Sequence, residues 1–488
     1  MKKYYFLFSK GSKINQIICA VLINLPVFAY GMCIGWMSPM TLLLQSEDSP
    51  RGTPLTDQEI SWMGSIAYLT CVPFDVIIAI LGDKLGRKNT LIFVSSTAVA
   101  CWITKLSSME VWAFVLARGL VGILMAGCYV TCPLYTKEIS EDSIRGALCS
   151  LVTLFHTSGN LFLYVIGDIL SYRTILWVCL SIPTLHIILF MMMPESPSYL
   201  VKQGKLEEAA RVLAWLRCRN EDDMEILNEL DVIKKEQLKD SEGSKFVVKA
   251  IVKDKLVFRA FRIVMVVSLA REVCGAIPVL NFAGNIFKIS SEGSGLVLTP
   301  NQQAMMLGAV QVIGSLLASS VVDATGRKTL LFSTSLLSGL SMCTLASWFV
   351  ARQYGLFGAD WLPILTLCLC IFCDAFGLQP ISVVLIGEMF SYKTRGTVMG
   401  TAMAFASLAA FLQMLFFKPV ASSIGIHVAF YSFGLVCILA SVYVILVIPE
   451  TKKRSLEEIY DKLKTRKEKG KELENVSVKE REANETVM

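Results

Sequence analysis

The sequence predicts an all-α membrane protein with twelve transmembrane helices arranged as two six-helix bundles. Its 488 residues are 54% hydrophobic and only 18% charged, whereas about a quarter of the residues in soluble domains carry a charge. The apolar residues also run in blocks long enough to cross ~30 Å of hydrocarbon as helices. Finally, three sequence marks occur twice, once in each half of the chain. These observations exclude an ordinary cytosolic enzyme.

The apolar blocks, punctuated by Gly, Pro and charge clusters, divide into twelve expected spans. They lie near 14–44, 60–82, 90–107, 111–135, 147–170, 174–193, 258–288, 303–323, 329–351, 361–389, 397–421 and 426–448. The first block has span length and follows Lys10 and Lys13, so we expect a retained helix rather than a signal peptide.

The polar segments set the domain boundaries. Residues 194–257 separate the sixth span from the seventh, and within them 206–217 and 225–238 show the mixed charge and apolar period of soluble helices. We therefore expect an N-terminal bundle at 1–193, a cytosolic helical linker at 194–257 and a C-terminal bundle at 258–448. The tail at 449–488 alternates Lys and Glu and is expected to be largely disordered.

Charge distribution predicts the orientation and excludes some partners. The short loops at 82–88 and 323–328 are basic, whereas the loop at 45–59 is net acidic, which places both termini and the linker in the cytosol. We expect a multi-pass protein of the plasma membrane. The net charge of +6 is modest and lies mostly in linkers and tails, so nucleic acid is not an expected partner. The 15 Cys show no metal-like spacing and no loop cluster, and no metal or cofactor is expected.

Three paired marks indicate an internal duplication. Gly-Asp-Lys-Leu-Gly-Arg-Lys at 82–88 recurs as Asp-Ala-Thr-Gly-Arg-Lys at 323–328, and Glu138 followed by Arg145-Gly146 recurs as Glu388 followed by Arg395-Gly396. Pro-Glu-Ser at 194–196 recurs as Pro-Glu-Thr at 449–451. Each mark combines acid and base at a predicted cytosolic helix end.

Such marks could form a latch between the two bundles, because Arg can clamp a carboxylate in bidentate fashion and a breakable latch suits alternating access. The alternative is that the charges anchor helix ends at the lipid headgroups. For three duplicated marks we favour the latch. The candidate cytosolic gate residues are Asp83, Arg87, Arg118, Glu138, Arg145, Asp323, Arg327, Glu388 and Arg395.

These motifs, together with Ala-Arg-Gly at 117–119, Tyr-Thr-Lys-Glu at 135–138 and Gly-Glu-Met-Phe at 387–390, resemble the sugar porters of the major facilitator superfamily. The resemblance covers about 14–460 and is strongest to insect facilitative trehalose and hexose transporters. It implies two six-helix bundles around a central sugar site and passive, carrier-type exchange. No chemical change of the substrate is implied, so the protein is not expected to be an enzyme.

The substrate positions depart from the family pattern. The fifth-helix Gln is replaced by Thr153, the eighth-helix Asn by Gln311, and the seventh-helix Gln-Gln-x-Ser-Gly-x-Asn by Arg271-Glu272-Val-Cys-Gly-Ala-Ile. The tenth helix lacks the family's Trp. Asn281 and Asn285, four residues apart on one helix face, are expected to meet sugar hydroxyls, since an Asn facing lipid would be costly. His156 is a further cavity candidate, although an interhelical structural His is the more common outcome.

Intramembrane charges require partners. We expect Arg271 to face Asp374 across the cavity, leaving Glu272 to bind a hydroxyl or a cationic group; a purely structural ion pair between the seventh and tenth helices is an equal alternative. Thr153, His156, Arg271, Glu272, Asn281, Asn285, Gln311 and Asp374 are the substrate-binding candidates. The first helix carries no carboxylate in Tyr-Gly-Met-Cys-Ile-Gly at 30–35, which favours facilitated diffusion over proton coupling.

The expected function is uniport of trehalose or a hexose by alternating access, in a lipid bilayer and as a monomer. Two alternatives remain open. One is a transport-dead sugar sensor or scaffold, which would have no reason to keep both sets of gate marks. The other is a porter for a non-sugar polar solute, which Arg271 and Glu272 suggest.

Overall fold

The computed structural model describes residues 11–47, 49–241, 253–292, 297–356, 359–452 and 454–464. Every regular element assigned in these ranges is helical, as predicted. The N-terminal half contains α1 (Ile14–Gly35), α2 (Met37–Leu44), α3 (Asp57–Leu85), α4 (Arg87–Ser107), α5 (Val111–Ile139), α6 (Asp142–Ile169) and α7 (Tyr172–Phe190). The connecting segment contains α8 (Pro197–Lys202), α9 (Leu206–Leu216) and α10 (Met224–Ser241).

The C-terminal half contains α12 (Lys255–Glu272), α13 (Ala276–Ser291), α14 (Pro300–Thr325), α15 (Arg327–Gln353), α16 (Leu362–Cys373), the π-turn η1 (Asp374–Leu378), α17 (Gln379–Met389), α18 (Tyr392–Val420), the π-turn η2 (Ala421–Gly425) and α19 (Ile426–Val447). A short helix, α20 (Leu456–Leu463), follows. The part of the predicted disordered tail at 465–488 lies outside the described residues.

Membrane-spanning length is present in both halves. Ten helical stretches in the described part of the chain are long and apolar enough to cross a bilayer, and the stretch Thr394–Val447 contains both α18 and α19. With α14, which is 26 residues long, the helices correspond to the twelve predicted spans. The twelve-helix expectation is therefore confirmed.

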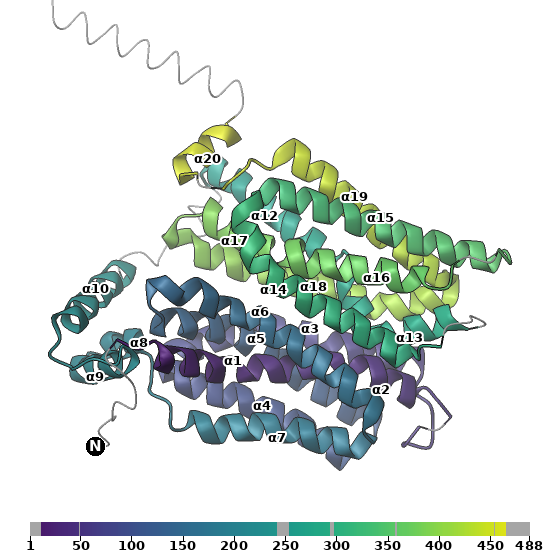
Figure 1. Cartoon of the computed structure of the whole chain (residues 1–488), viewed down its shortest axis with the longest axis horizontal. Coiled ribbons are helices and arrows are strands. Elements are labelled where there is room, and N and C mark those ends of the chain that lie inside the picture. The colour runs from purple at the N-terminus through teal and green to yellow at the C-terminus, as the bar shows by residue number, and fades with distance from the viewer. Residues whose placement is uncertain are drawn as a thin grey trace, which may run out of the picture.

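The helices gather into two bundles. Figure 1 shows the purple-to-blue helices packed on one side and the green-to-yellow helices on the other. The closest packing within the halves joins α3 to α5, α1 to α6 and α15 to α19. The halves meet where α3 packs on α18, α6 on α14 and α2 on α13. The interface between the halves is thus formed by a few helices from each.

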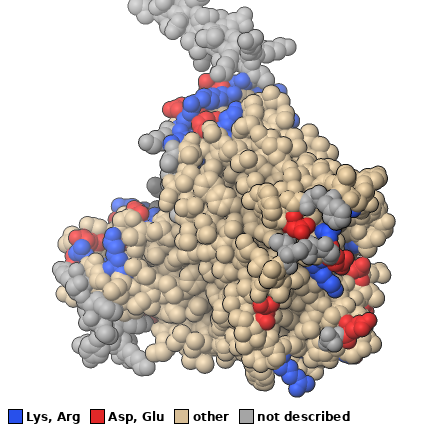
Figure 2. All heavy atoms as spheres, turned by 45° about the vertical axis from the view of Figure 1, so that its right-hand side comes forward, with Lys and Arg blue, Asp and Glu red and all other residues tan. Residues whose placement is uncertain are grey.

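The outer surface of the bundles is apolar. Figure 2 shows a broad uncharged face, with charged side chains gathered mainly toward the two ends of the molecule. Large exposed hydrophobics on this surface include Val76, Trp177, Leu435 and Leu446. Exposed apolar side chains over such an area are stable when lipid covers them.

Three helices that the sequence predicts as continuous are interrupted in the structure. Trp36 separates α1 from α2, residues 273–275 separate α12 from α13, and η1 interrupts the tenth span. Gly275 has φ +92°, and a Cβ there would lie 2.5 Å from the Phe433 ring. Glycine is needed at this position both for its backbone conformation and for close packing.

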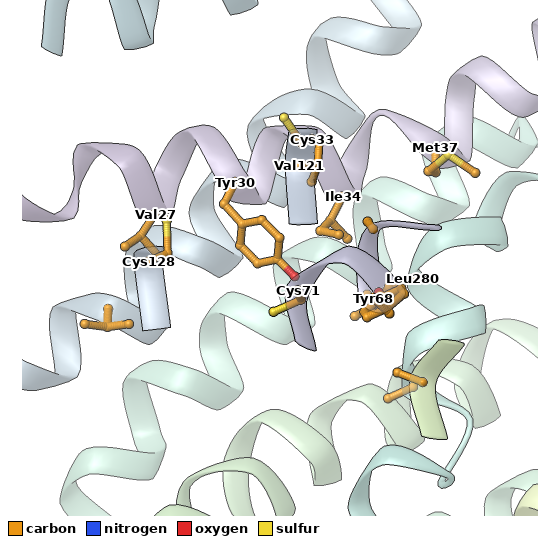
Figure 3. Packing of buried hydrophobic residues seen from close by; sticks show 14 of the residues in the cluster. Val27, Tyr30, Cys33, Ile34, Met37, Tyr68, Cys71, Val121, Cys128 and Leu280 are labelled. Carbon is orange, nitrogen blue, oxygen red and sulfur yellow. The ribbon is translucent and has the colours of Figure 1, made fainter. Parts of the chain in front are cut away.

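The core of the N-terminal half extends to the surface it shares with the other half. Figure 3 shows Tyr30 reaching from α1 toward Cys71 of α3, with Cys33 and Cys128 among the neighbouring buried side chains. Both Tyr30 and Cys71 are under 4% exposed. The cysteines therefore pack as small buried hydrophobes, as their scattered positions predict.

The connecting segment and the final helix each pack on one bundle. Asn15 at the start of α1 donates to the Trp215 carbonyl of α9 at 2.7 Å, and Arg217 donates to the Ile139 carbonyl at 2.8 Å. On the other half, the Tyr460 hydroxyl of α20 donates to the Met389 carbonyl at 3.0 Å. We call the end of the molecule that carries α9 and α20 the linker end, and the end that carries α2 the far end.

Candidate functional site

The first duplicated cluster lies at the linker end of the N-terminal half. The Arg87 guanidinium lies 3.0 Å from Glu138 Oε1 of α5 and 3.0 Å from Asp83 Oδ1 of α3, and it donates to the Gly82 carbonyl at 2.5 Å. The Ser196 hydroxyl also donates to Glu138. Arg87 is 7% exposed, so this is a nearly buried ion-pair network.

The second cluster repeats this arrangement at the linker end of the C-terminal half. The Arg327 guanidinium lies 2.8 Å from Glu388 Oε1 and donates to the Val322 carbonyl at 3.0 Å. The Thr451 hydroxyl donates to Glu388 at 2.5 Å. The duplicated sequence marks therefore fold into duplicated side-chain networks.

A second carboxylate in each cluster caps a helix. Glu195 accepts from the backbone N–H groups of Arg87 and Lys88 at 2.9 and 3.1 Å, at the first turn of α4. Glu450 accepts from those of Arg327 and Lys328 at 3.0 and 3.1 Å, at the first turn of α15. A carboxylate satisfies the free amides of a helix N-terminus and complements its dipole.

The two capping carboxylates differ in their protonation equilibria. Burial raises the pKa of Glu195 above its usual value, more strongly than the backbone N–H groups lower it. Burial also opposes ionisation of Glu450, but there the backbone N–H groups prevail and its pKa is lowered. The same motif is therefore less hydrated in the N-terminal half.

The predicted latch between the bundles is not formed among the described residues of this structure. Arg87 and its partners all belong to the N-terminal half, and the described partners of Arg327 all belong to the C-terminal half. Arg145 pairs with Asp142 in its own helix, and Arg395 donates to the Gly387 and Phe390 carbonyls. Each Arg finds a carboxylate or carbonyl one turn or one helix away, which satisfies it without the other half. The side chain of Asp323 lies outside the described residues.

Arg118 was assigned to the wrong end. It lies in the second turn of α5, which begins at the far end and reaches the linker end only at Ile139. Its guanidinium is fully buried and donates to the carbonyls of Met63 and Cys33 at 3.1 and 2.8 Å. It thereby holds the chain just before the break at Trp36. The Ala-Arg-Gly motif carries no information on depth, because depth depends on the direction in which α5 crosses the membrane.

The predicted contact between Arg271 and Asp374 is present. Arg271 Nε lies 3.3 Å from Asp374 Oδ1, which joins the end of α12 to the π-turn η1. Gly377 allows this turn to approach α15, because a Cβ there would lie 2.5 Å from Thr334 Cγ2. π-turns inside α-helices often mark functional sites.

The sequence analysis did not predict a contact between Arg271 and Glu272. Arg271 pairs with Glu272 as well, although neighbours on a regular helix diverge by about 100°. The helix ends at Glu272, so the backbone no longer holds the two long side chains apart. The Arg271 guanidinium therefore contacts the carboxylates of both Glu272 and Asp374.

Aromatic side chains of the N-terminal half lie near the ionic group of Arg271, Glu272 and Asp374. We call this region between the halves the centre. The His156 ring of α6 stacks on Tyr30, with centroids 5.1 Å apart at 22°, and Tyr129 meets it edge-on at 6.5 Å. Thr153 lies three residues earlier on α6, on the same helix face. His156 and Tyr129 are both within electrostatic range of Arg271, which brings the aromatic groups and the ionic group to the same region between the halves.

The remaining candidates bridge the halves. Asn281 donates to the Tyr68 hydroxyl at 3.4 Å and Asn285 to Gln45 Oε1 at 2.7 Å. Gln311 accepts from Asn160 at 3.0 Å. The structure thus brings Asn281 near the centre, whereas Asn285 lies at the far end.

Several contacts join the two halves at the far end, and the sequence analysis did not predict them. We call these contacts the far-end ties. The Tyr164 hydroxyl of α6 donates to the Leu280 carbonyl at 2.5 Å, and Ser38 accepts from the Gly284 backbone N–H at 2.8 Å. Lys418 of α18 lies 3.0 Å from Gln45 Oε1 and 3.6 Å from Asp57 Oδ1. A lone Lys between apolar blocks was the available signal for the last of these, but nothing in the sequence reveals which helix faces it.

Comparisons with known proteins agree on one relationship. Residues 18–463 match the family described as sugar (and other) transporter. The facilitated trehalose transporter Tret1 of Culex quinquefasciatus is 26% identical over 92% of this chain and 86% of its own length. The human solute carrier family 2, facilitated glucose transporter member 6, is 29% identical over 88% of both chains.

Solved structures share the fold. The xylose transporter XylE from E. coli, in an inward-open conformation, superposes with a TM-score of 0.73 at 18% identity, over 91% of this chain and 99% of its own. The proton:xylose symporter XylE bound to 6-bromo-6-deoxy-D-glucose gives 0.69 at 19% identity, over 93% of this chain and 100% of its own. Both have the major facilitator fold expected from the sequence.

Proposed function

The chain belongs to the sugar (and other) transporter family, and we propose that it carries a sugar, trehalose or a hexose, across the plasma membrane by facilitated diffusion. The observation that carries this proposal is the polar centre between the halves. Broken helices of the C-terminal half present Arg271, Glu272 and Asn281 to the aromatic groups around His156. Discontinuous helices at the interface of two repeats are typical of transporter substrate sites.

We propose that the substrate binds in the region between the halves that contains Arg271, Asn281 and His156. Sugar hydroxyls would meet Asn281, Thr153 and Glu272, and His156 with Tyr30 would offer an apolar face. Asp374 would orient Arg271. Asn285 and Gln311, which bridge the halves in this structure, would bind sugar only in a conformation that separates them from Gln45 and Asn160.

The proposal includes an orientation and a division of the chain. The basic linker-end loops favour cytosolic termini, with bundles at 1–193 and 258–448, a cytosolic linker at 194–257 and a cytosolic tail at 449–488. Function as a monomer follows from a site formed between the two halves of one chain.

An uptake assay tests the proposal. Purified protein in liposomes should equilibrate labelled trehalose or glucose to the external concentration, and an uncoupler should have no effect. Accumulation above that concentration, abolished by the uncoupler, would contradict facilitated diffusion. Protein that is correctly folded in liposomes but moves neither sugar would instead support the sensor alternative.

A further inference from the structure

The ionic group at the centre is not electrically balanced. Arg271 contacts both Glu272 and Asp374, so two carboxylates share one guanidinium. Among the described residues, the ion pairs of Glu272 and Asp374 are those with Arg271. One negative charge therefore remains, and an uncompensated charge away from bulk water is costly.

Two members of the ionic group are not completely buried. The Arg271 and Glu272 side chains are 21% and 12% exposed, whereas Asp374 is 3% exposed. Tyr68 and Tyr129 of the N-terminal half are within electrostatic range of both Arg271 and Glu272. Glu272 is thus the more exposed of the two carboxylates.

The neighbouring unpartnered atoms include further acceptors. Asn281 is 1% exposed, and its Oδ1 has no hydrogen-bond partner among the described residues, although its amide group reaches Tyr68. Both ring nitrogens of His156 are likewise buried without a described partner, and a neutral imidazole offers one acceptor nitrogen. Buried polar atoms in native structures are nearly always satisfied, and a ligand or a water that donates hydrogen bonds would satisfy these acceptors.

We propose that the centre binds a polyhydroxy compound that carries a protonated amine, with the ammonium group on Glu272 and hydroxyls on Asn281 and His156. This deepens the proposed function and rests on it, because it places the ligand in the same transport site. An ammonium supplies three donors and the missing positive charge. A charge-assisted hydrogen bond is about twice as strong as a neutral one.

Competition among matched sugars tests the proposal. In liposomes at mildly acidic pH, glucosamine should inhibit uptake of labelled glucose or trehalose at a concentration about tenfold lower than glucose or N-acetylglucosamine does, which corresponds to about 1.4 kcal/mol. N-acetylation removes the charge and leaves the ring hydroxyls. Equal inhibition by the charged and neutral sugars would overturn the proposal. It would also mean that a proton, rather than an amine, balances the cluster.

A variant pair locates the effect. Glu272→Gln should abolish the preference for glucosamine by removing the unbalanced charge, whereas Glu207→Gln, at an exposed position on α9, should leave it unchanged. A preference that survives Glu272→Gln would reject Glu272 as the ammonium site. If Glu272→Gln does not fold, thermal stabilisation of the wild-type protein by glucosamine and N-acetylglucosamine gives the deciding comparison. Failure of the wild-type protein to move any sugar would refute the proposed sugar transport itself.

Discussion

The two ends of the molecule use polar groups in different ways. At the linker end, Arg87 and Arg327 bind partners within their own halves. At the far end, Lys418 and Tyr164 bind across the halves, to Gln45 and to the Leu280 carbonyl. A carrier that rocks must keep each bundle rigid while it makes and breaks contacts between them. We therefore expect the linker-end clusters to act as internal braces and the far-end ties to bias the conformational equilibrium.

The largest expected effect comes from breaking an internal brace. Arg87→Ala leaves Glu138, whose side chain is 10% exposed, without its cation, and breaking a buried pair costs roughly 3–5 kcal/mol. Arg327→Ala should cost less, because the Glu388 side chain is 25% exposed and remains better hydrated. Thermal unfolding in detergent should rank Arg87→Ala as the less stable variant.

A latch would give a different result. If these Arg residues joined the halves, both variants would keep wild-type stability and change only the accessibility of the linker end to a thiol probe. If Arg87→Ala unfolds at the same temperature as the wild-type protein, Arg87 does not stabilise the N-terminal bundle as proposed. The double variant Arg87→Ala with Glu138→Gln should lose less stability than the sum of the single variants, because it strands no charge.

The next effect concerns a charged far-end tie. Lys418→Gln removes the cation that lies near Asp57 and Gln45, and hydrogen bonds to charged groups contribute about 1.5–3 kcal/mol. The variant should shift toward a conformation open at the far end, by at least about tenfold. Thiol labelling of a cysteine placed between α2 and α13 should accelerate, and unchanged labelling would refute the tie.

A smaller shift is expected from one neutral hydrogen bond. Tyr164→Phe removes the bond to the Leu280 carbonyl, which contributes about 0.5–1.5 kcal/mol, so the conformational equilibrium should move by severalfold. Tyr135→Phe is the matched control, since its hydroxyl donates to the Pro194 carbonyl within one half. Equal labelling changes in the two variants would show that the loss is not specific to the interface.

The smallest effect compares the capping carboxylates. The pKa of Glu195 is raised in the folded state, so its ionisation destabilises the folded state as pH rises. The pKa of Glu450 is lowered, so its ionised form stabilises the folded state. This stability is lost as pH falls through the lowered pKa. At neutral pH, Glu450→Gln should destabilise slightly and Glu195→Gln should be neutral or slightly stabilising. The stabilities of the two variants, measured by unfolding from neutral to acidic pH, should converge as pH falls. If Glu195→Gln were the less stable variant at neutral pH, the difference in burial would be contradicted.

Much of the fold could be predicted, because hydrophobic length and turn residues are local properties. The expected first and last spans, 14–44 and 426–448, agree closely with α1–α2 and α19. The paired marks also showed which charges lie at the linker end, but the pairing of Glu138 with Arg87 and of Glu388 with Arg327 within each half was not predicted. The breaks at Trp36 and Gly275 were missed, although Gly35 and Gly275 were available signals, because an isolated glycine inside a helical run is often tolerated.

The candidate site was predicted only in part. The cost of burying Arg271 and Asp374 in a membrane was enough to predict their contact. The pairing of Arg271 with Glu272 could not be predicted, because it depends on the helix ending at Glu272. The same limit applied to Arg118, whose depth follows from the crossing direction of α5.

The sequence by itself determined the number of membrane helices, because placing polar groups in hydrocarbon is costly. It also determined the duplication, through the repeated motifs, and the residues that carry charge. Only the tertiary structure decided which charges meet. An Arg near a helix end can satisfy itself within its own bundle or across to the other, and both choices neutralise it equally well. At the linker end, Arg87 and Arg327 pair with Glu138 and Glu388 of their own halves. At the far end, Lys418 lies beside Gln45 and Asp57 of the other half.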